Sequence, residues 1–419
     1  MNPAKNIVTW ADYYPEVAEI FAHNLIDWPC EKIDTGLGPV VQPCVAQGPG
    51  QEIFVSGYRG HVFHSVDLGK TWSLLCEAPG LNPVVPAGCE LAYLHVKGGV
   101  TIGGVEVHGR GATREGALLL LWSMNYNDGR DRREAGDESH RQTTWVTRSV
   151  DQGKTWEATA PFDDALLRNI TANQGNMVQL ADGRILAHAL ARSNTPDKQK
   201  ATNSLFYASD DDGRTWSFFS AFVDLSSEPH LMEVEPGRML AALRYQRDKR
   251  PADPANLATG YDAELWGEFA HHQNPWGKPT DIGVRIFQHT ALSASRDGGR
   301  TWSKPRVVTG LLQQSASLNR LSDGTLALIF GRPGQRLMLS YDEGETWAKV
   351  VYQLHDDGEY ARAVVLQDDT LVVVHDFGHY MWHKENDARL GVLRVKVPPR
   401  QEVEKHGFFI PREVEAGLR

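Results

Sequence analysis

The chain has 419 residues, of which 41% are hydrophobic and 23% charged, which is the balance of an ordinary globular protein. Its net charge of -10 without a long acidic run argues against nucleic acid as a partner, and no apolar stretch is long enough to span a membrane. The first residues lack a basic region followed by an apolar core, which predicts a cytoplasmic protein, or a secreted or periplasmic one if a signal has been removed.

In chain order, the first 33 residues are an N-terminal leader. Residues 15–23 within it predict a short helix, and the leader is also a candidate to donate a strand that closes a ring of sheets. One large domain is expected over residues 34–400, with a long insertion at about 247–286. Residues 401–419 are expected to form a C-terminal tail. The four cysteines match no zinc spacing and are interpreted as isolated thiols.

Five copies of the pattern S-x-D-x-G-x-T-W are distributed along the domain. They lie at 65–72, 149–156, 209–216, 295–302 and 340–347. Asp-x-Gly supplies a tight turn in which the Asp side chain caps the backbone and Gly takes positive φ. Ser and Thr can hydrogen-bond across the turn, and Trp starts the outgoing strand and buries a large area. Each copy therefore predicts a hairpin turn with an aromatic anchor, which is structural rather than catalytic.

Four further hairpins consist of a strand, a two-residue turn and a second strand. Their turns fall at 182–183, 236–237, 323–324 and 368–369. The shortest interval between repeat aspartates is 45 residues, close to the roughly 40–50 residues of one four-stranded propeller blade. Longer intervals contain insertions or a blade without the repeat. The strand pattern gives a count of six blades in one domain.

The repeats resemble the Asp-box, or BNR repeat, of sialidases. On these residues the chain is identified as a divergent member of the sialidase superfamily. The resemblance implies an all-β fold, a six-bladed β-propeller with four-stranded antiparallel blades. It also implies that the repeats lie on the face away from the active site.

The resemblance also extends to site motifs in the fourth and sixth blades. Glu228 stands where sialidases have the Glu that polarises a nucleophilic Tyr, and Arg244 where they have an Arg that grips the substrate carboxylate. His230, in the same stretch, is a further substrate-binding candidate. Tyr360 takes the nucleophile position, and Asp376 replaces the usual Glu that supports an Arg. A phenol with a pKa of about 10 needs a neighbouring base, for which Glu228 would serve.

A third stretch, in the fifth blade, resembles the one that completes the carboxylate clamp of sialidases. Arg336 fits that position best, and Arg332 is the second choice. Two guanidinium groups on one carboxylate give planar, bidentate recognition, which implies an anionic sugar.

The first blade departs from the sialidase pattern. Residues 40–44 contain no Arg, and the following short loop contains no carboxylate to act as the acid. Arg59 is a candidate to supply a clamp from a new position, and Glu90 is a candidate general acid. Trp266, in the long insertion, is a candidate to stack on a sugar ring.

The resulting hypothesis is an exo-acting glycoside hydrolase that acts on a terminal acidic sugar and needs no cofactor. A two-histidine spacing at His379 and His383 lacks an evident third ligand, so no metal site is predicted. Two alternatives remain open: a polysaccharide lyase that acts on a uronic sugar, and a glycan-binding propeller without turnover.

Overall fold

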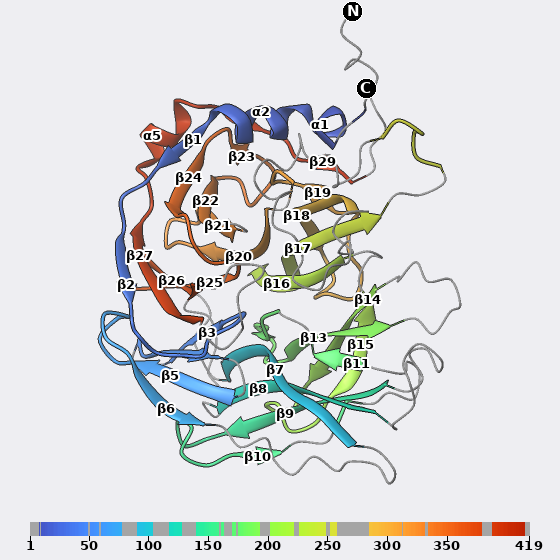
Figure 1. Cartoon of the computed structure of the whole chain (residues 1–419), viewed down its shortest axis with the longest axis vertical. Coiled ribbons are helices and arrows are strands. Elements are labelled where there is room, and N and C mark those ends of the chain that lie inside the picture. Colours follow the sequence, from blue (N-terminus) through green and yellow to red (C-terminus); the bar gives the residue numbers. More distant parts are fainter. Residues whose placement is uncertain are drawn as a thin grey trace, which may run out of the picture.

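The computed structural model describes most of the chain. The described residues are 8, 10–48, 51–57, 60–77, 90–103, 117–127, 140–158, 161–162, 170–172, 175–192, 202–221, 226–248, 252–257, 285–311, 313–331, 334–378 and 388–414. Their strands form six sheets of four or five strands, together with one two-stranded pair. Figure 1 shows the sheets arranged around a common centre.

The first three sheets follow one another in the chain. Sheet one contains β3 (Cys44–Gln47), β4 (Ile53–Ser56), β5 (His61–Ser65) and β6 (Ser73–Glu77). Sheet two contains β7 (Glu90–Gly103), β8 (Ala117–Asn127), β9 (His140–Ser149) and β10 (Glu157–Ala158). Sheet three contains β11 (Ile170–Ala172), β12 (Val178–Gln179), β13 (Ile185–Arg192), β14 (Thr202–Ser209) and β15 (Ser217–Ala221).

The last three sheets combine consecutive strands with strands from the two ends of the chain. Sheet four contains β16 (Ser226–Glu235), β17 (Arg238–Asp248), β18 (Arg285–Ser295), β19 (Arg306–Val307) and β29 (Arg412–Glu413). Sheet five contains β20 (Gln314–Arg320), β21 (Leu326–Gly331), β22 (Gln335–Ser340), β24 (Val351–His355) and β1 (Leu25–Asp27). Sheet six contains β25 (Ala361–Val365), β26 (Thr370–Phe377), β27 (Arg389–Lys396) and β2 (Glu31–Asp34). The separate pair is β23 (Trp347–Ala348) with β28 (Phe408–Phe409).

The all-β propeller expected from the sequence is confirmed, but a uniform four-stranded antiparallel blade is wrong for three sheets. Sheet three has its first strand divided into β11 and β12, both paired with β13. Sheet four gains β29 on the far side of β19. Sheet five gains β1, which pairs in parallel with β24. An added strand gives hydrogen-bond partners to backbone groups that would otherwise lie on an open sheet edge. The hairpin pattern of the sequence does not show which sheets gain such a strand.

The first strands of the sheets contact one another in order around the centre. β3 lies beside β7, and β7 beside β11; β12 then lies beside β16, β16 beside β20, β20 beside β25, and β25 again beside β3. The apolar core lies between the faces of neighbouring sheets. Val372 of sheet six, for example, shares a cluster with Ile53 of sheet one, and Leu119 of sheet two shares one with Ile185 of sheet three.

The five repeats form the predicted turns with one hydrogen-bond pattern. In each copy the Ser hydroxyl donates to the Asp carboxylate, the Gly N–H donates to the Ser oxygen, and the Thr hydroxyl donates to the Asp at 2.6 Å. The Trp ring N–H donates to the Gly carbonyl. The Gly φ angles lie between +82° and +89°. The expected burial of Trp is complete at Trp216 and Trp347, and the other three are half-buried.

Each repeat glycine packs on the preceding sheet. A Cβ added to the glycine would lie 2.8 to 3.4 Å from an aliphatic side chain there. The pairs are Gly69 with Val372, Gly153 with Leu75, Gly213 with Leu119, Gly299 with Leu186, and Gly344 with Leu240. The first repeat therefore packs on the last sheet, so the two ends of the strand order are in contact.

The helix predicted for residues 15–23 is confirmed as α2 (Pro15–His23), which follows α1 (Trp10–Tyr13). Both helices lie along one edge of the molecule, near α5 (Arg400–Glu404) (Figure 1). Val17 and Ile20 bury the inner face of α2 in the core cluster of sheets four and five.

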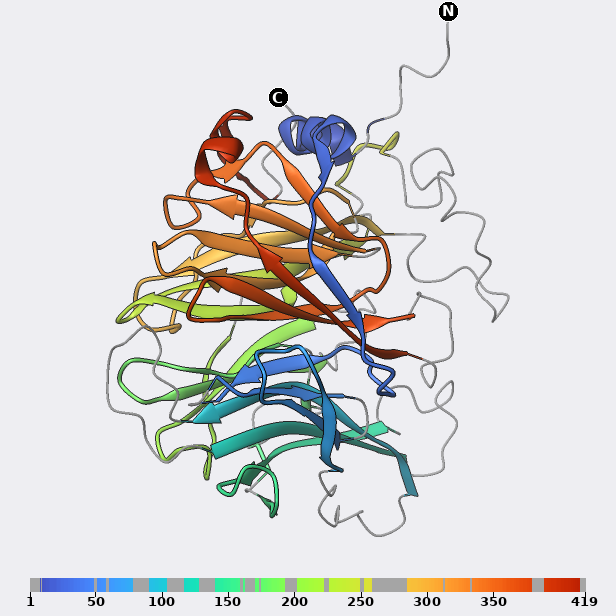
Figure 2. The ribbon, with the colours of Figure 1, turned by 90° about the vertical axis from the view of Figure 1, so that its left-hand side faces the viewer.

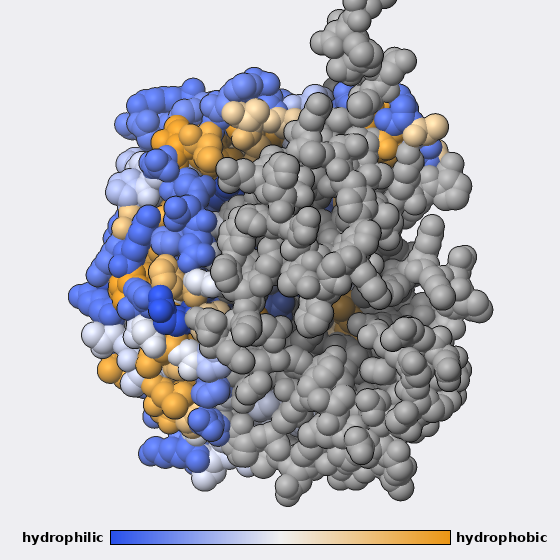
Figure 3. Space-filling model, in the orientation of Figure 1, coloured by the Kyte–Doolittle hydropathy of each residue, from blue (hydrophilic) through white to orange (hydrophobic). Residues whose placement is uncertain are grey.

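The N-terminal strand β2 lies beside β27, as Figure 2 shows, and is the outer strand of sheet six. The described part of the face in Figure 3 is mostly hydrophilic with smaller hydrophobic groups. Within the described ranges, no helix is both long and apolar enough to cross a membrane.

Candidate functional site

Glu228 and Arg244 form a buried ion pair at the start of sheet four. Arg244 Nη1 donates to Glu228 Oε1 at 2.9 Å, and the two side chains are 11% and 9% exposed, respectively. Glu228 has a φ of +51°, and the register between β16 and β17 shifts between Ser227 and His230. A positive φ in a non-glycine residue is strained and is often found at functional sites. Glu228 Oε2 is buried and accepts no hydrogen bond from the described residues.

Tyr360 lies just before β25, and the carboxylate of Asp376, near the end of β26, accepts its backbone N–H. Asp376 Oδ1 accepts the backbone N–H groups of Glu359 at 2.8 Å and Tyr360 at 2.9 Å. Asp376 is fully buried and Tyr360 is 4% exposed. The carboxylate of Asp376 therefore holds the chain that carries Tyr360 in place.

Arg336 extends from β22 and is held by two amide side chains. Its Nε donates to Gln353 Oε1 at 2.9 Å, and its Nη1 donates to Gln313 Oε1. Burial lowers the pKa of Arg336 to about 10, and the group remains charged at neutral pH. Gln353 and Gln313 are neutral, so their amide oxygens position this guanidinium without neutralising its charge.

Arg362 was not among the candidates predicted from the sequence, although the structure buries it near them. It lies on β25, two residues beyond Tyr360, and is 1% exposed. Its charge interacts with Glu228, Tyr360 and Cys44, and it helps burial to lower the pKa of His230 to about 3. The sequence did carry a signal, because a charged residue stands in an otherwise apolar strand, two positions after Tyr360.

His230 is hydrogen-bonded within the described structure. Its Nδ1 accepts the backbone N–H of Leu318 at 3.2 Å, and its Nε2 lies 3.4 Å from the hydroxyl of Ser317. The lowered pKa leaves the ring neutral at neutral pH. His230 therefore links sheet four to sheet five as a neutral side chain.

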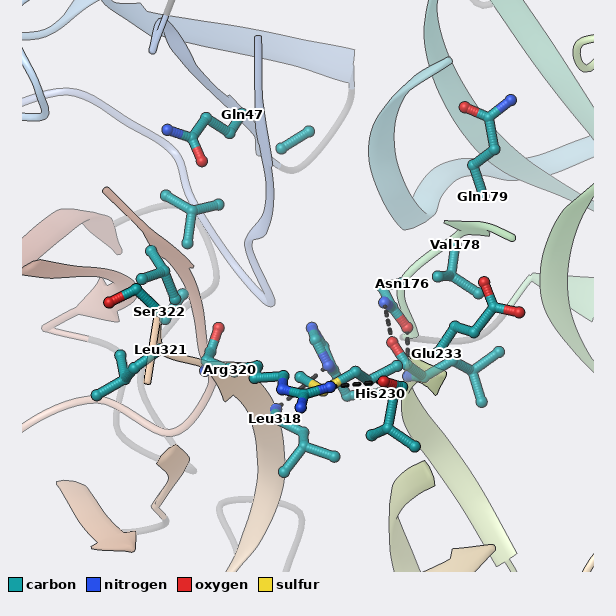
Figure 4. A pocket seen from close by; sticks show the side chains of 18 of the residues that line it. Gln47, Asn176, Val178, Gln179, His230, Glu233, Leu318, Arg320, Leu321 and Ser322 are labelled. Carbon is teal, nitrogen blue, oxygen red and sulfur yellow. Dashed lines mark hydrogen bonds between the residues drawn. The ribbon is translucent and has the colours of Figure 1, made fainter. Parts of the chain in front are cut away.

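An axial cavity of about 860 Å³ lies among the first strands and is lined by residues of β3, β12, β16, β20 and β25. Figure 4 shows His230, Asn176, Glu233 and Arg320 around it. The lining covers the ends of these strands that lead into the hairpin turns, whereas Glu228 and Tyr360 stand at the opposite, starting ends. Of the candidate residues whose side chains the structure describes, only His230 lines this cavity.

The turn end of the cavity is tied together by side chains that join neighbouring sheets. Glu233 accepts the N–H of Ala181 at 2.6 Å, and Arg320 donates to the carbonyl of Val234. Asp369 accepts the N–H of Ser322 at 2.8 Å. These polar groups already have hydrogen-bond partners within the protein, and the contacts join neighbouring sheets at this end of the cavity.

The remaining candidates lie wholly or partly outside the described residues. Arg59, Arg332 and Trp266 belong to segments that are not described. Glu90 begins β7, but only its backbone is described. Within the described segments, no group of three or more His, Cys, Asp or Glu side chains is arranged to hold a metal ion.

Comparison with known proteins shows which fold the chain has but does not assign the chain to a family. No protein-family model matches the chain, and no curated protein matches its sequence. Among solved structures, a protein of unknown function from Dyadobacter fermentans is 18% identical with a TM-score of 0.58, over 87% of this chain and 98% of that one.

Two of the solved structures with this fold are enzymes. A Hadza microbial sialidase is 17% identical with a TM-score of 0.53, over 85% of this chain and 65% of that one, so the chain spans less than two thirds of its length. An α-L-arabinofuranosidase of Fusarium graminearum, solved with an iminosugar inhibitor, is 12% identical with a TM-score of 0.55, over 91% and 98% of the two chains. The chain therefore has a sialidase-like β-propeller fold.

Proposed function

We propose that the protein is an exo-acting glycoside hydrolase that acts on a terminal acidic sugar, with Tyr360 as nucleophile and Glu228 as its base. The observation that carries the proposal is the buried Glu228–Arg244 pair beside a second buried arginine whose charge also interacts with Tyr360. A neutral phenol avoids like-charge repulsion from an anionic substrate, and sialidases use a Tyr for this step. Glycosidases among the proteins that share the fold agree with this reaction class.

The six sheets are, in this proposal, the six blades of one closed ring. The support is the unbroken order of contacts among their first strands and the packing of the first repeat on the last sheet. In such a ring, the starting ends of the first strands converge on the axis. Glu228, on β16, and Tyr360, before β25, then face the same region although 132 residues separate them in the sequence.

The test is turnover of a panel of sialosides, uronic-acid glycosides and arabinofuranosides, with products identified by mass spectrometry. The wild type should release a terminal acidic sugar, and Tyr360→Phe should lower kcat by about 1,000-fold or more, since it removes the nucleophilic oxygen. Tyr352→Phe is the matched control, because its buried hydroxyl has no partner among the described residues and lies in the core between sheets five and six. That variant should keep wild-type turnover.

Other products would redirect the assignment. An unsaturated sugar that absorbs in the ultraviolet would indicate a lyase, and equal turnover by Tyr360→Phe and the wild type would remove Tyr360 from the mechanism. Thermal stabilisation by glycans without any product would support a binding protein.

A further inference from the structure

Arg362 is a buried arginine that uses only part of its hydrogen-bonding capacity. Its Nη1 donates to the carbonyl oxygens of Ser315 and Ala316, both at 3.1 Å, and of Ala361 at 2.9 Å. Its Nε and Nη2 are also buried, and neither has a hydrogen-bond partner among the described residues. One nitrogen thus anchors the guanidinium in the fold, while Nε and Nη2 form a side, called the open edge below, that has no hydrogen-bond partner among the described residues.

Arg148 is a second buried arginine, and its hydrogen bonds provide a comparison for those of Arg362. It is 2% exposed, similar to Arg362, but all three of its nitrogens have partners. Nε donates to the carbonyl of Asp212 at 3.0 Å, Nη2 to the carboxylate of Asp212 at 2.8 Å, and Nη1 to Glu157 at 3.0 Å. A buried donor without a partner is energetically costly. The nitrogens of Arg148 avoid this cost, whereas Nε and Nη2 of Arg362 do not.

The geometry of the open edge defines what would fit it. Nε–H and the adjacent Nη2–H of a guanidinium point in parallel from one side, and their spacing matches the two oxygens of a carboxylate. We propose that Arg362 binds the carboxylate of the substrate sugar through Nε and Nη2. This inference rests on the proposed function and names the residue of that site that selects an acidic sugar.

The surroundings of Arg362 leave its charge available for a ligand. Glu228 is within its electrostatic reach, but Oε1 of that carboxylate is already paired with Arg244. Cys44, on the first sheet, is also close, and burial raises the pKa of its thiol to about 11, which keeps it neutral. The first blade lacks the arginine expected from the sialidase pattern, so Arg362 places a guanidinium beside this region from the sixth sheet.

A carboxylate held by Arg362 would also lie near the reacting groups. Arg362 lies on β25 two residues beyond Tyr360, and its charge interacts with Glu228, so the bound sugar would lie near the proposed base and nucleophile. Because the open edge has almost no contact with bulk water, a charge-assisted hydrogen bond there is stronger than one at the surface.

The experiment measures binding by calorimetry, without turnover. The probes are N-acetylneuraminic acid and glucuronic acid, each compared with its neutral methyl ester. We expect the wild type to bind at least one acid about tenfold or more tightly than its ester. Arg362→Gln should lower affinity for the acid to that for the ester and leave the ester almost unchanged. Arg362→Lys should recover part of the difference, because the ammonium keeps the charge but not the paired donors.

Arg148→Gln is the matched control for loss of a buried guanidinium. It should lower the thermal midpoint but leave the ratio of acid to ester affinity at the wild-type value. An unchanged ratio in folded Arg362→Gln would overturn the inference, as would wild-type protein that binds neither acid more tightly than its ester. If Arg362→Gln does not fold, Arg362→Lys is the deciding variant. An acid-to-ester affinity ratio in Arg362→Lys equal to that of the wild type would overturn the inference. Selective binding of an acid without cleavage of any glycoside would leave the inference standing and reject the proposed hydrolysis.

Discussion

At the scale of single residues, the Glu228–Arg244 pair combines burial with opposite charge. Removal of one partner leaves the other charge buried without compensation, which is strongly destabilising. We expect Arg244→Met to lower the free energy of unfolding by about 3 kcal/mol, measured by urea denaturation. Glu228→Met in the same chain should recover part of that loss. Additive effects of the two substitutions would show that the pair has no coupling.

The repeat aspartates give a second prediction at this scale. Hydrogen bonds from the Thr155 side chain and backbone, and from Thr301 in the fourth repeat, lower the pKa values of Asp151 and Asp297 to about 2. A carboxyl whose pKa is lower in the folded state than in the unfolded state stabilises the fold above its unfolded value, near 4. That contribution is lost as the pH falls from about 4 to about 2.

This acid sensitivity can be assigned to one repeat by comparison with Asp151→Asn, which does not titrate. The thermal midpoint of the wild type should exceed that of the variant at pH 6, and the difference should shrink between about pH 4 and pH 2. A difference that stays constant over this range would contradict a lowered pKa of Asp151.

At the scale of elements, the repeat turn fits against the sheet before it. Gly213 has a φ of +84°, and an added Cβ would lie 2.9 Å from Leu119. Gly237, in a hairpin turn, has a φ of +77° with nothing within 4 Å. Gly237→Ala should therefore cost about 1 kcal/mol of stability from backbone strain alone, and Gly213→Ala should cost at least about 1 kcal/mol more because of the contact.

Urea denaturation of the two glycine variants separates these effects. Equal losses would mean that the turn is not held against sheet two, and that backbone conformation alone requires glycine. Leu119→Ala in the Gly213→Ala background is the matching control, since it removes the side chain that the new methyl group meets. The double variant should lose less stability than the sum of the two single substitutions, which is a negative coupling energy.

At the scale of the whole molecule, the N-terminal segment joins sheets five and six. The Trp28 ring donates through Nε1 to the carbonyl of Lys396 at 2.8 Å and packs edge-on against Tyr352 at 5.4 Å. We expect Trp28→Ala to lower the free energy of unfolding by about 3 kcal/mol, because it removes both the packing and the link. Trp28→Phe keeps a ring and should cost only about 1 kcal/mol.

The control for Trp28 is Phe218→Ala, at an aromatic side chain on β15 that is 41% exposed. It should change stability by about 0.5 kcal/mol or less. Should Trp28→Ala cost no more than this control, the N-terminal segment would contribute little to holding the two sheets together.

Much of the architecture could be predicted from the sequence because it depends on local chemistry. Asp, Gly and Thr at fixed spacing form the same turn wherever they occur, so the repeats at Asp67 and Asp342 predict it without tertiary context. The helix at Pro15–His23 was likewise predicted, with proline at its first position. The leader was expected to donate a strand, and β1 lies within it, but its pairing with sheet five was not predicted. The strand β29 was missed, since a two-residue strand carries little periodic signal.

The sequence by itself thus determined the all-β propeller, the repeat turns and which residue types are candidates for a site. Only the tertiary structure decided their partners. Arg244 pairs with Glu228, the Asp376 carboxylate accepts the N–H of Tyr360, and Arg362 lies buried where its charge interacts with Glu228 and Tyr360. The physical reason is distance along the chain. Turn chemistry acts over a few residues, whereas the environment of a charge at the axis depends on strands more than a hundred residues apart, whose approach is set by sheet packing.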